Sequence, residues 1–201
     1  MRKLFIAIGI TLAAGAACGE ENLPMKLSVW DVPSNDTLAI RSGPNADETK
    51  IGEIPANGHD IVAGQPIENM NWLRVTYGSR TGFVSTRFLA YGDGMNPYAL
   101  PVRLQCSGTE PFWGIEIGYR RADMDFAYDE TKASIVIGDP VTAMGQPNLH
   151  MLPGMGKDAV SFLLIEAEEC SDGMSEKQYP YSLRARVGGG LLSGCCEKTI
   201  P

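Results

Sequence analysis

Five cysteines are the residues of this sequence whose chemistry depends most on their surroundings. Four of them lie in the C-terminal half, at Cys106, Cys170, Cys195 and Cys196. Neighbouring residues of a strand point to opposite faces, so Cys195 and Cys196 are expected to have different partners. Cys106 and Cys170 should therefore each pair with one of them, in an order that the sequence leaves open. No Cys-x-x-Cys spacing occurs and no histidine lies nearby in the sequence, which favours structural disulfides over a redox or metal thiol site.

Glu110 and Asp172 are the acidic residues that invite an acid–base interpretation. A glycosidase needs two carboxylates at a defined separation across a cleft. Here Glu110 precedes Pro111 and Asp172 precedes Gly173, and both pairs are typical of turns. The sequence also lacks a phosphate-binding glycine loop, a Gly-x-Ser-x-Gly elbow and a His-Glu-x-x-His motif. We therefore predict no catalytic residue, no cofactor and no enzyme activity, with an envelope enzyme as the least favoured alternative.

A stretch with methionines and a histidine, residues 138–158, offers a different chemistry. Its possible metal ligands are Met144, His150, Met151 and Met155. Thioethers select Cu(I), so an alternative function is periplasmic copper binding or a role in envelope stress. The glycines and prolines of the stretch predict a long loop, which could also be a binding lid or a plain excursion. Methionine fills irregular gaps in a core as well, so the pattern alone does not require a metal.

The composition is that of an acidic globular protein. Hydrophobic residues make up 44% of the chain and charged residues 20%, which is ordinary for a soluble fold. The formal net charge is −7, and it becomes −9 without Arg2 and Lys3. An acidic protein repels phosphate backbones, so we expect no nucleic acid partner. The 23 glycines and 13 prolines separate short apolar runs, which predicts many turns and strands rather than long helices.

Residues 1–17 have the pattern of a signal peptide. Arg2 and Lys3 form a basic start, residues 4–12 are apolar, and residues 13–17 are small. The apolar run is too short to span a hydrocarbon layer of about 30 Å as a helix. We therefore expect the protein to be exported to the periplasm or cell envelope.

Residues 15–18, Gly-Ala-Ala-Cys, resemble a lipoprotein box, in which the cysteine is acylated and becomes the first residue of the mature protein. Gly15 departs from the box, where a leucine-like residue is usual. The alternative is cleavage at the nearby Ala-Gly-Ala, which would leave a soluble periplasmic protein. Without Cys18 the chain has four cysteines, an even number that suits an exported, disulfide-forming protein. We therefore expect Cys18 to be lipidated and to anchor the protein in a membrane.

Residues 25–92 divide into short strand-like segments separated by turn signals. About five strands in about 65 residues suit a small barrel, which hides the edges of its sheet. A barrel of this size needs large apolar side chains to bury enough surface. We expect its core to include Ile40, Trp72, Val75 and Phe83.

This region resembles the bacterial Src-homology-3 (SH3-like, SH3b-type) family. The resemblance is carried, in order, by residues 40–44 (Ile-Arg-Ser-Gly-Pro), 51–55 (Ile-Gly-Glu-Ile-Pro), 72–75 (Trp-Leu-Arg-Val), 82–85 (Gly-Phe-Val-Ser) and 88–89 (Phe-Leu). Ala39 and Phe83 depart from the pattern, which often has asparagine and tryptophan there, and both lie near regions that could tune binding. Family members are often attached to envelope proteins and cell-wall enzymes, and some recognise peptidoglycan or short peptides.

Trp30, Asn71 and Tyr77 are the candidate residues of a ligand groove. Each is amphipathic or polar and lies near an expected strand end or loop. Binding would rest on a shallow groove with aromatic walls and few charges. The ligand that the resemblance implies is peptidoglycan or an envelope protein or peptide.

Residues 93–100 are rich in turn-forming residues and are expected to be a linker to a second unit, residues 101–201. Apolar residues alternate with polar or small ones around 113–119, 133–137 and 181–187, which predicts antiparallel strands with one buried face. Residues 160–169 are ambiguous between helix and strand, and their neighbours favour a strand. We therefore expect an all-β protein, in which a small SH3-like barrel is followed by a second antiparallel barrel or sandwich.

Three motifs of the second unit look like a family of uncharacterised bacterial envelope proteins and lipoproteins. They are residues 106–113, 170–181 and 194–196, and the resemblance covers roughly residues 101–197. It implies a location in the envelope and brings no established activity. The function that the sequence supports best is therefore an exported, non-catalytic binding protein of the cell envelope.

Overall fold

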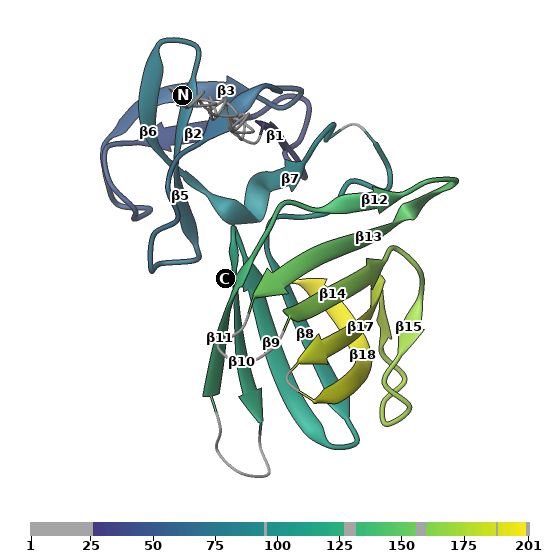
Figure 1. Cartoon of the computed structure of the whole chain (residues 1–201). Helices are drawn as coiled ribbons and strands as arrows, with labels where there is room; N and C mark the ends of the chain where they lie inside the picture. Colours follow the sequence, from purple (N-terminus) through teal and green to yellow (C-terminus); the bar gives the residue numbers. More distant parts are fainter. Residues whose placement is uncertain (1–25, 95, 127–131, 156–159, 188, 200–201) are drawn as a thin grey trace, which may run out of the picture.

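The computed structural model describes residues 26–94, 96–126, 132–155, 160–187 and 189–199. These residues form β-strands, their connections and one 3₁₀ turn, with no α-helix among them. The all-β fold class predicted from the sequence is therefore confirmed. Nor does this part of the chain contain a helix long and apolar enough to cross a membrane. Two large antiparallel sheets, one in residues 26–91 (the N-terminal unit) and one in residues 104–198 (the barrel), lie one above the other in Figure 1.

The N-terminal unit is a seven-stranded sheet in the order β3-β2-β6-β5-β4-β1-β7. Its elements in chain order are β1 (Lys26–Val29), β2 (Thr37–Arg41), β3 (Lys50–Pro55), β4 (Ile61–Ala63), β5 (Trp72–Tyr77), β6 (Arg80–Ser85), the 3₁₀ turn η1 (Thr86–Phe88) and β7 (Leu89–Tyr91). Alternate residues of a strand are buried, as with Leu38 and Ile40 of β2. Each of the seven strands contributes at least one side chain to the hydrophobic core, so the sheet curls around its own interior.

The second sheet has nine strands and closes on itself, because β11 pairs with β13. Its strands are β8 (Leu104–Thr109), β9 (Phe112–Gly118), β10 (Arg121–Phe126), β11 (Lys132–Ile137), β12 (Val141–Ala143), β13 (Gln146–Met155), β14 (Val160–Glu166), β17 (Tyr181–Val187) and β18 (Gly190–Lys198). Eight strands form the closed barrel in the order β11-β10-β9-β8-β18-β17-β14-β13, and β13 pairs with β11 to close it. The ninth strand, β12, pairs only with β13 among the described strands and lies outside the closed ring. The prediction of a barrel or a sandwich is thus decided in favour of a closed barrel, and residues 160–166 are a strand as predicted.

The interior of the barrel is filled with side chains. Its inward positions carry fully buried aliphatic residues, among them Leu104, Ile115, Ile117, Ile137 and Leu152. Near one end the Trp113 ring packs against Gly108 and Gly194, where an added Cβ would collide with the indole or with the backbone. The motif glycines around the cysteines therefore make room for a core tryptophan.

A small two-stranded sheet covers the outside of the barrel beside β18. It consists of β15 (Cys170–Ser171) and β16 (Gln178–Tyr179), which pair with each other. We call it the flap. It lies in the connection between β14 and β17, and Figure 1 shows it at the margin of the barrel.

The segment between the two units is packed against both of them. Ala99 and Leu100 are buried, and the Tyr91 amide donates to the Leu100 carbonyl at 2.9 Å. The Val102 amide donates back to Leu89 at 3.0 Å. On the other side, Met70 of the N-terminal unit lies against Gly118 of the barrel. The segment expected to be a linker is therefore hydrogen-bonded and partly buried at its C-terminal end. A single hydrophobic core extends from one unit into the other.

The long loop expected over residues 138–158 is a wrong prediction. Residues 141–143 and 146–155 are the strands β12 and β13. Pro153 and Gly154 suggested a loop, yet β13 changes its neighbour at this point from β12 to β11. A proline is tolerated where a strand exchanges partners, because one side of the ladder is interrupted there.

Candidate functional site

A groove of about 750 Å³ lies on the N-terminal unit where it meets the barrel. Its aromatic wall is formed by Trp72, the first residue of β5, and Phe88 of η1. Leu38 and Ala39 of β2 also line it. The Thr86 hydroxyl donates to the Met70 carbonyl at 2.6 Å, which ties η1 to the segment that precedes β5. The groove therefore has an apolar, aromatic surface held between three elements, as ligand sites commonly do.

The charges of the groove are predominantly positive. Arg41, Arg87 and Arg103 line it together with a single acidic residue, Asp36, which gives a formal charge of +2 in a chain whose net charge is −7. Arg41 donates to the Glu48 carbonyl at 2.7 Å, and the Arg87 guanidinium lies 5.1 Å from the centre of the Phe88 ring. The groove therefore carries more charged side chains than we expected, and one of them, Arg103, is paired with Glu116 of β9, which does not line the groove.

Of the three predicted groove residues, one lines the groove. Asn71 is exposed at its rim, directly before Trp72. Trp30 lies elsewhere, with the Lys198 ammonium 3.7 Å from the centre of its ring, so it joins the N-terminal unit to the end of the barrel. Tyr77 is half-buried at the far end of β5 and does not line the groove.

Trp72 was expected in the core, and the structure places it in the groove wall instead. Leu73 and Val75 are the buried residues of β5, and Trp72 is half-buried. Because side chains of a strand alternate, Trp72 and Val75 cannot face the same side. Phe83 is half-buried for the same reason beside the buried Val84, whereas Ile40 and Val75 lie in the core as predicted. The alternation along β5 was the signal that could have found Trp72.

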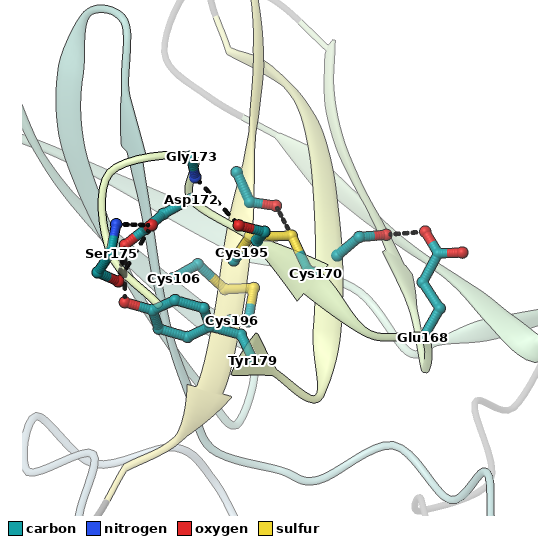
Figure 2. Close-up of a disulfide and its surroundings, with 12 residues drawn as sticks. Cys106, Glu168, Cys170, Asp172, Gly173, Ser175, Tyr179, Cys195 and Cys196 are labelled. Atoms are coloured by element: carbon teal, nitrogen blue, oxygen red, sulfur yellow. Dashed lines mark hydrogen bonds between the residues drawn. A yellow bond between two sulfur atoms is a disulfide. The ribbon is translucent and has the colours of Figure 1, made fainter. Parts of the chain in front are cut away.

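The four barrel cysteines form two disulfides, Cys106–Cys196 and Cys170–Cys195. Figure 2 shows both bridges next to each other at β18. Cys196 faces Cys106 on the neighbouring β8, inside the barrel, and Cys195 points outward to the flap. The prediction that adjacent cysteines have different partners is therefore confirmed, and the structure supplies the order that the sequence left open.

A polar pocket of about 350 Å³ lies under the flap. Asp172 lines it, and its carboxylate accepts the backbone N–H groups of Met174 at 3.0 Å and Ser175 at 2.9 Å. Figure 2 draws Asp172 together with Ser175. These bonds lower the pKa of Asp172, the Met174 amide contributing most. Asp172 therefore holds the turn of the flap as a carboxylate.

Glu110 does not line this pocket. It is exposed in the turn between β8 and β9, where a cis peptide bond joins it to Pro111. An acid–base pair would need both carboxylates on one cleft. Asp172 and Glu110 therefore lie in two different turns, and the two carboxylates do not share a cleft.

The four candidate metal ligands are placed differently from one another. Met144 is fully exposed in the β12–β13 turn, and His150 is buried. The Tyr98 carbonyl accepts from His150 Nε2 at 2.8 Å, and the Thr142 hydroxyl lies 3.1 Å from Nδ1, so both ring nitrogens have partners. Met151 follows His150 on β13 and points to the opposite face, and the side chain of Met155 lies outside the described part of the structure.

His150 has a structural environment instead. Burial lowers its pKa below the ordinary value, which keeps the ring neutral. Since the Tyr98 carbonyl can only accept, Nε2 carries the proton and Nδ1 accepts from Thr142. Within the described ranges, no three His, Cys, Asp or Glu side chains gather in a way that could hold a metal ion.

Residues 1–17 and Cys18 lie outside the described residues, so the leader and the lipidation site stay predictions. No model of a known protein family matches this sequence, and no curated protein matches it either.

Proposed function

We propose that this protein is an exported, non-catalytic binding protein of the cell envelope, whose N-terminal unit is an SH3-like module that recognises peptidoglycan or an envelope peptide. The groove walled by Trp72 and Phe88 is the observation that carries the proposal. Aromatic rings offer large rigid contact area, and two of them beside arginines suit an extended peptide with acidic groups.

The two disulfides support the envelope location. Disulfides persist in oxidising compartments such as the bacterial periplasm. Lipidation at Cys18 is part of the proposal, and it would hold the groove near the cell wall and raise its effective concentration there. Mass spectrometry of the membrane-extracted protein tests it: an acylated N-terminal Cys18 is expected, and a mature chain without this modification would exclude the anchor.

Co-sedimentation with purified peptidoglycan tests the binding function. The chain from residue 19 onward should sediment with the wall material, and Trp72→Ala should abolish most of the bound fraction. Tyr77→Ala is the matched control, because Tyr77 is a half-buried aromatic residue of the same strand outside the groove.

Retention by the wild type and by Tyr77→Ala, but not by Trp72→Ala, is the result that the proposal requires. Equal retention of both variants would place binding elsewhere on the chain. If the wild type stays in the supernatant and also fails to bind soluble wall peptides, the proposed function is wrong.

A further inference from the structure

The two disulfides of the barrel differ in how closely a thiol from solution can approach them. Cys106 and Cys196 are fully buried inside the barrel, and Cys195 is only 2% exposed. Cys170, the first residue of the flap strand β15, is partly exposed. Figure 2 shows both bridges at β18, one within the barrel and one leading to the flap. Of the four bridge cysteines, Cys170 is therefore the one that exchange chemistry can reach.

The polar pocket under the flap provides the approach to this bridge. Cys170 and Cys195 line the pocket of about 350 Å³, and Cys106 and Cys196 do not. Ser193, two positions before Cys195 on β18, is exposed in its wall. Access to a disulfide sulfur is one of the factors that set how fast a thiolate attacks it. The flap bridge should therefore exchange with thiols in the folded chain, and the inner bridge should resist them.

Few other polar contacts attach the flap to the barrel among the described residues. Lys177, in the flap turn, forms an ion pair with Glu197 of β18 at 2.7 Å. Both side chains are partly exposed, and ion pairs at the surface contribute little to stability. The Asp172 carboxylate bonds within the flap turn, so it orders the turn without attaching it to the barrel. The bridge Cys170–Cys195 is thus the main attachment of the flap to β18.

We propose that Cys170 is a thiol–disulfide exchange site, at which a protein dithiol reduces the flap bridge. The attacking thiolate forms a bond to Cys170 Sγ, and the bond to Cys195 Sγ breaks with its electron pair on Cys195, which takes up a proton. The second thiol of the reductant then displaces Cys170 Sγ, so the reductant leaves as a disulfide and both cysteines become thiols. Two electrons and two protons pass from the dithiol to the bridge. Reduction frees the flap from β18 and uncovers the polar pocket, while Cys106–Cys196 keeps β8 and β18 joined.

Timed reduction of the folded chain tests the difference between the two bridges. The chain from residue 19 onward, which lacks the Cys18 thiol, is treated with dithiothreitol, alkylated at intervals and mapped by mass spectrometry. Cys170 and Cys195 should be alkylated at least about tenfold faster than the inner pair. Similar rates for all four cysteines, or faster alkylation of the inner pair, would overturn the proposal.

A trapping experiment tests whether a protein thiol attacks Cys170 itself. The probe is reduced thioredoxin in which serine replaces the second active-site cysteine, so that the mixed disulfide is not resolved. The covalent adduct should form with the folded chain and should map to Cys170. The absence of an adduct, or an adduct on any other cysteine, would show that Cys170 is not the exchange site.

Ser193→Trp tests the route through the pocket. A large ring in the pocket wall should slow alkylation of Cys170 and Cys195 at least about threefold and leave the inner pair unchanged. Leu191→Trp is the matched control, because Leu191 is exposed on the same strand and does not line the pocket. An unchanged rate in Ser193→Trp, or equal slowing in both variants, would contradict access through the pocket.

Release of the flap alone is the structural consequence to be measured. After selective reduction, hydrogen–deuterium exchange should become faster in residues 170–179 and stay the same in β9. Faster exchange throughout the barrel, or no change in residues 170–179, would show that the flap bridge does not control the flap.

Discussion

One sheet of this protein closes into a barrel and the other does not. The closed barrel is the rigid support, and the groove lies on the N-terminal unit. The barrel joins its ends through β11 and β13 and carries two disulfides at β18. The N-terminal sheet runs from β3 to β7 without a pairing between these two strands, and β7 is bordered by residues 100–102. It has no disulfide among its described residues. The closed barrel fills its interior with aliphatic side chains, whereas the open sheet leaves half-buried aromatic and arginine side chains beside its loops.

The described residues of the barrel leave no binding groove in its interior, because its inward-facing positions carry core side chains. The interior of an eight-stranded barrel can be filled by its own side chains, as it is here. The groove lies on β2, on the first residue of β5 and on neighbouring loops of the N-terminal unit, and residues of the barrel complete it at the junction. Binding residues on loops held by a rigid scaffold are a common arrangement.

Removing Cys106–Cys196 should have the largest effect on the barrel. The bridge spans 90 residues of sequence and Cys170–Cys195 spans 25. In the chain-entropy model these lengths correspond to about 4.6 and about 3.5 kcal/mol of stabilisation. Denaturant unfolding of the Cys106→Ala/Cys196→Ala and Cys170→Ala/Cys195→Ala variants should show that order. A larger loss for the flap bridge would mean that the barrel does not depend on its internal bridge as we describe.

Gly194→Ala tests whether the barrel interior is packed as tightly as the structure indicates. The added methyl group would collide with the Ser107 carbonyl and approach Trp113 Cζ2 to 2.7 Å. We expect a loss of about 3 kcal/mol in the free energy of unfolding. Gly189→Ala is the control, because a Cβ there meets nothing within 4 Å. Equal stability of the two variants would show that the barrel interior can accommodate a methyl group at position 194.

Trp72→Ala should reduce ligand binding without a matching loss of stability. The loss of a half-buried aromatic anchor should weaken ligand binding by about 2 kcal/mol, or roughly thirtyfold. The melting temperature of the barrel should change little, since β5 does not belong to its sheet. Calorimetry and peptide titration of the same preparation measure both quantities. A loss of binding that is matched by unfolding of the whole chain would contradict a separable binding surface.

His150 gives the smallest expected effect, and it concerns the junction. Its pKa is lower in the folded chain than the ordinary value of 6.5, because burial disfavours the charged ring. The unfolded chain therefore takes up a proton first, and stability should fall as the pH drops below about 6.5. His150→Gln should flatten this part of the pH profile in thermal unfolding. His59→Gln is the control, because it leaves the buried His150 ring in place and should keep the fall in stability with pH. If His59→Gln also flattens the profile, His150 is not its cause.

Much of the fold could be predicted from alternation and turn chemistry. The strands around Leu38 and Leu73 followed from the turn signals that bound them, and the strand around Ile115 followed from the period of two. The different partners of Cys195 and Cys196 followed from their adjacency. The strand at residues 146–155 was missed because Pro147, Pro153 and Gly154 are turn signals when only the neighbouring residues are considered. Only the exchange of partners along β13 makes them acceptable.

The groove was harder to predict because its residues come together only in the folded chain. Arg103 and Thr199 are 96 positions apart in the sequence numbering and meet through the β8–β18 ladder. Asn71 was found from its place beside an expected strand, and Trp72 could have been found from the alternation with Leu73. Nothing local predicts that Lys198 covers the Trp30 ring, so this position of Trp30 could not be predicted.

Hydrogen–deuterium exchange of the full chain, with and without soluble peptidoglycan fragments, would locate the binding surface directly. We expect slower exchange in residues 71–72 and 85–88 and at the ends of the barrel strands near Arg103 and Thr199. The backbone around Cys170 and Asp172 should exchange at the same rate in both samples. Protection confined to the flap and its polar pocket, or no protection despite saturating ligand, would show that the groove is not the recognition site.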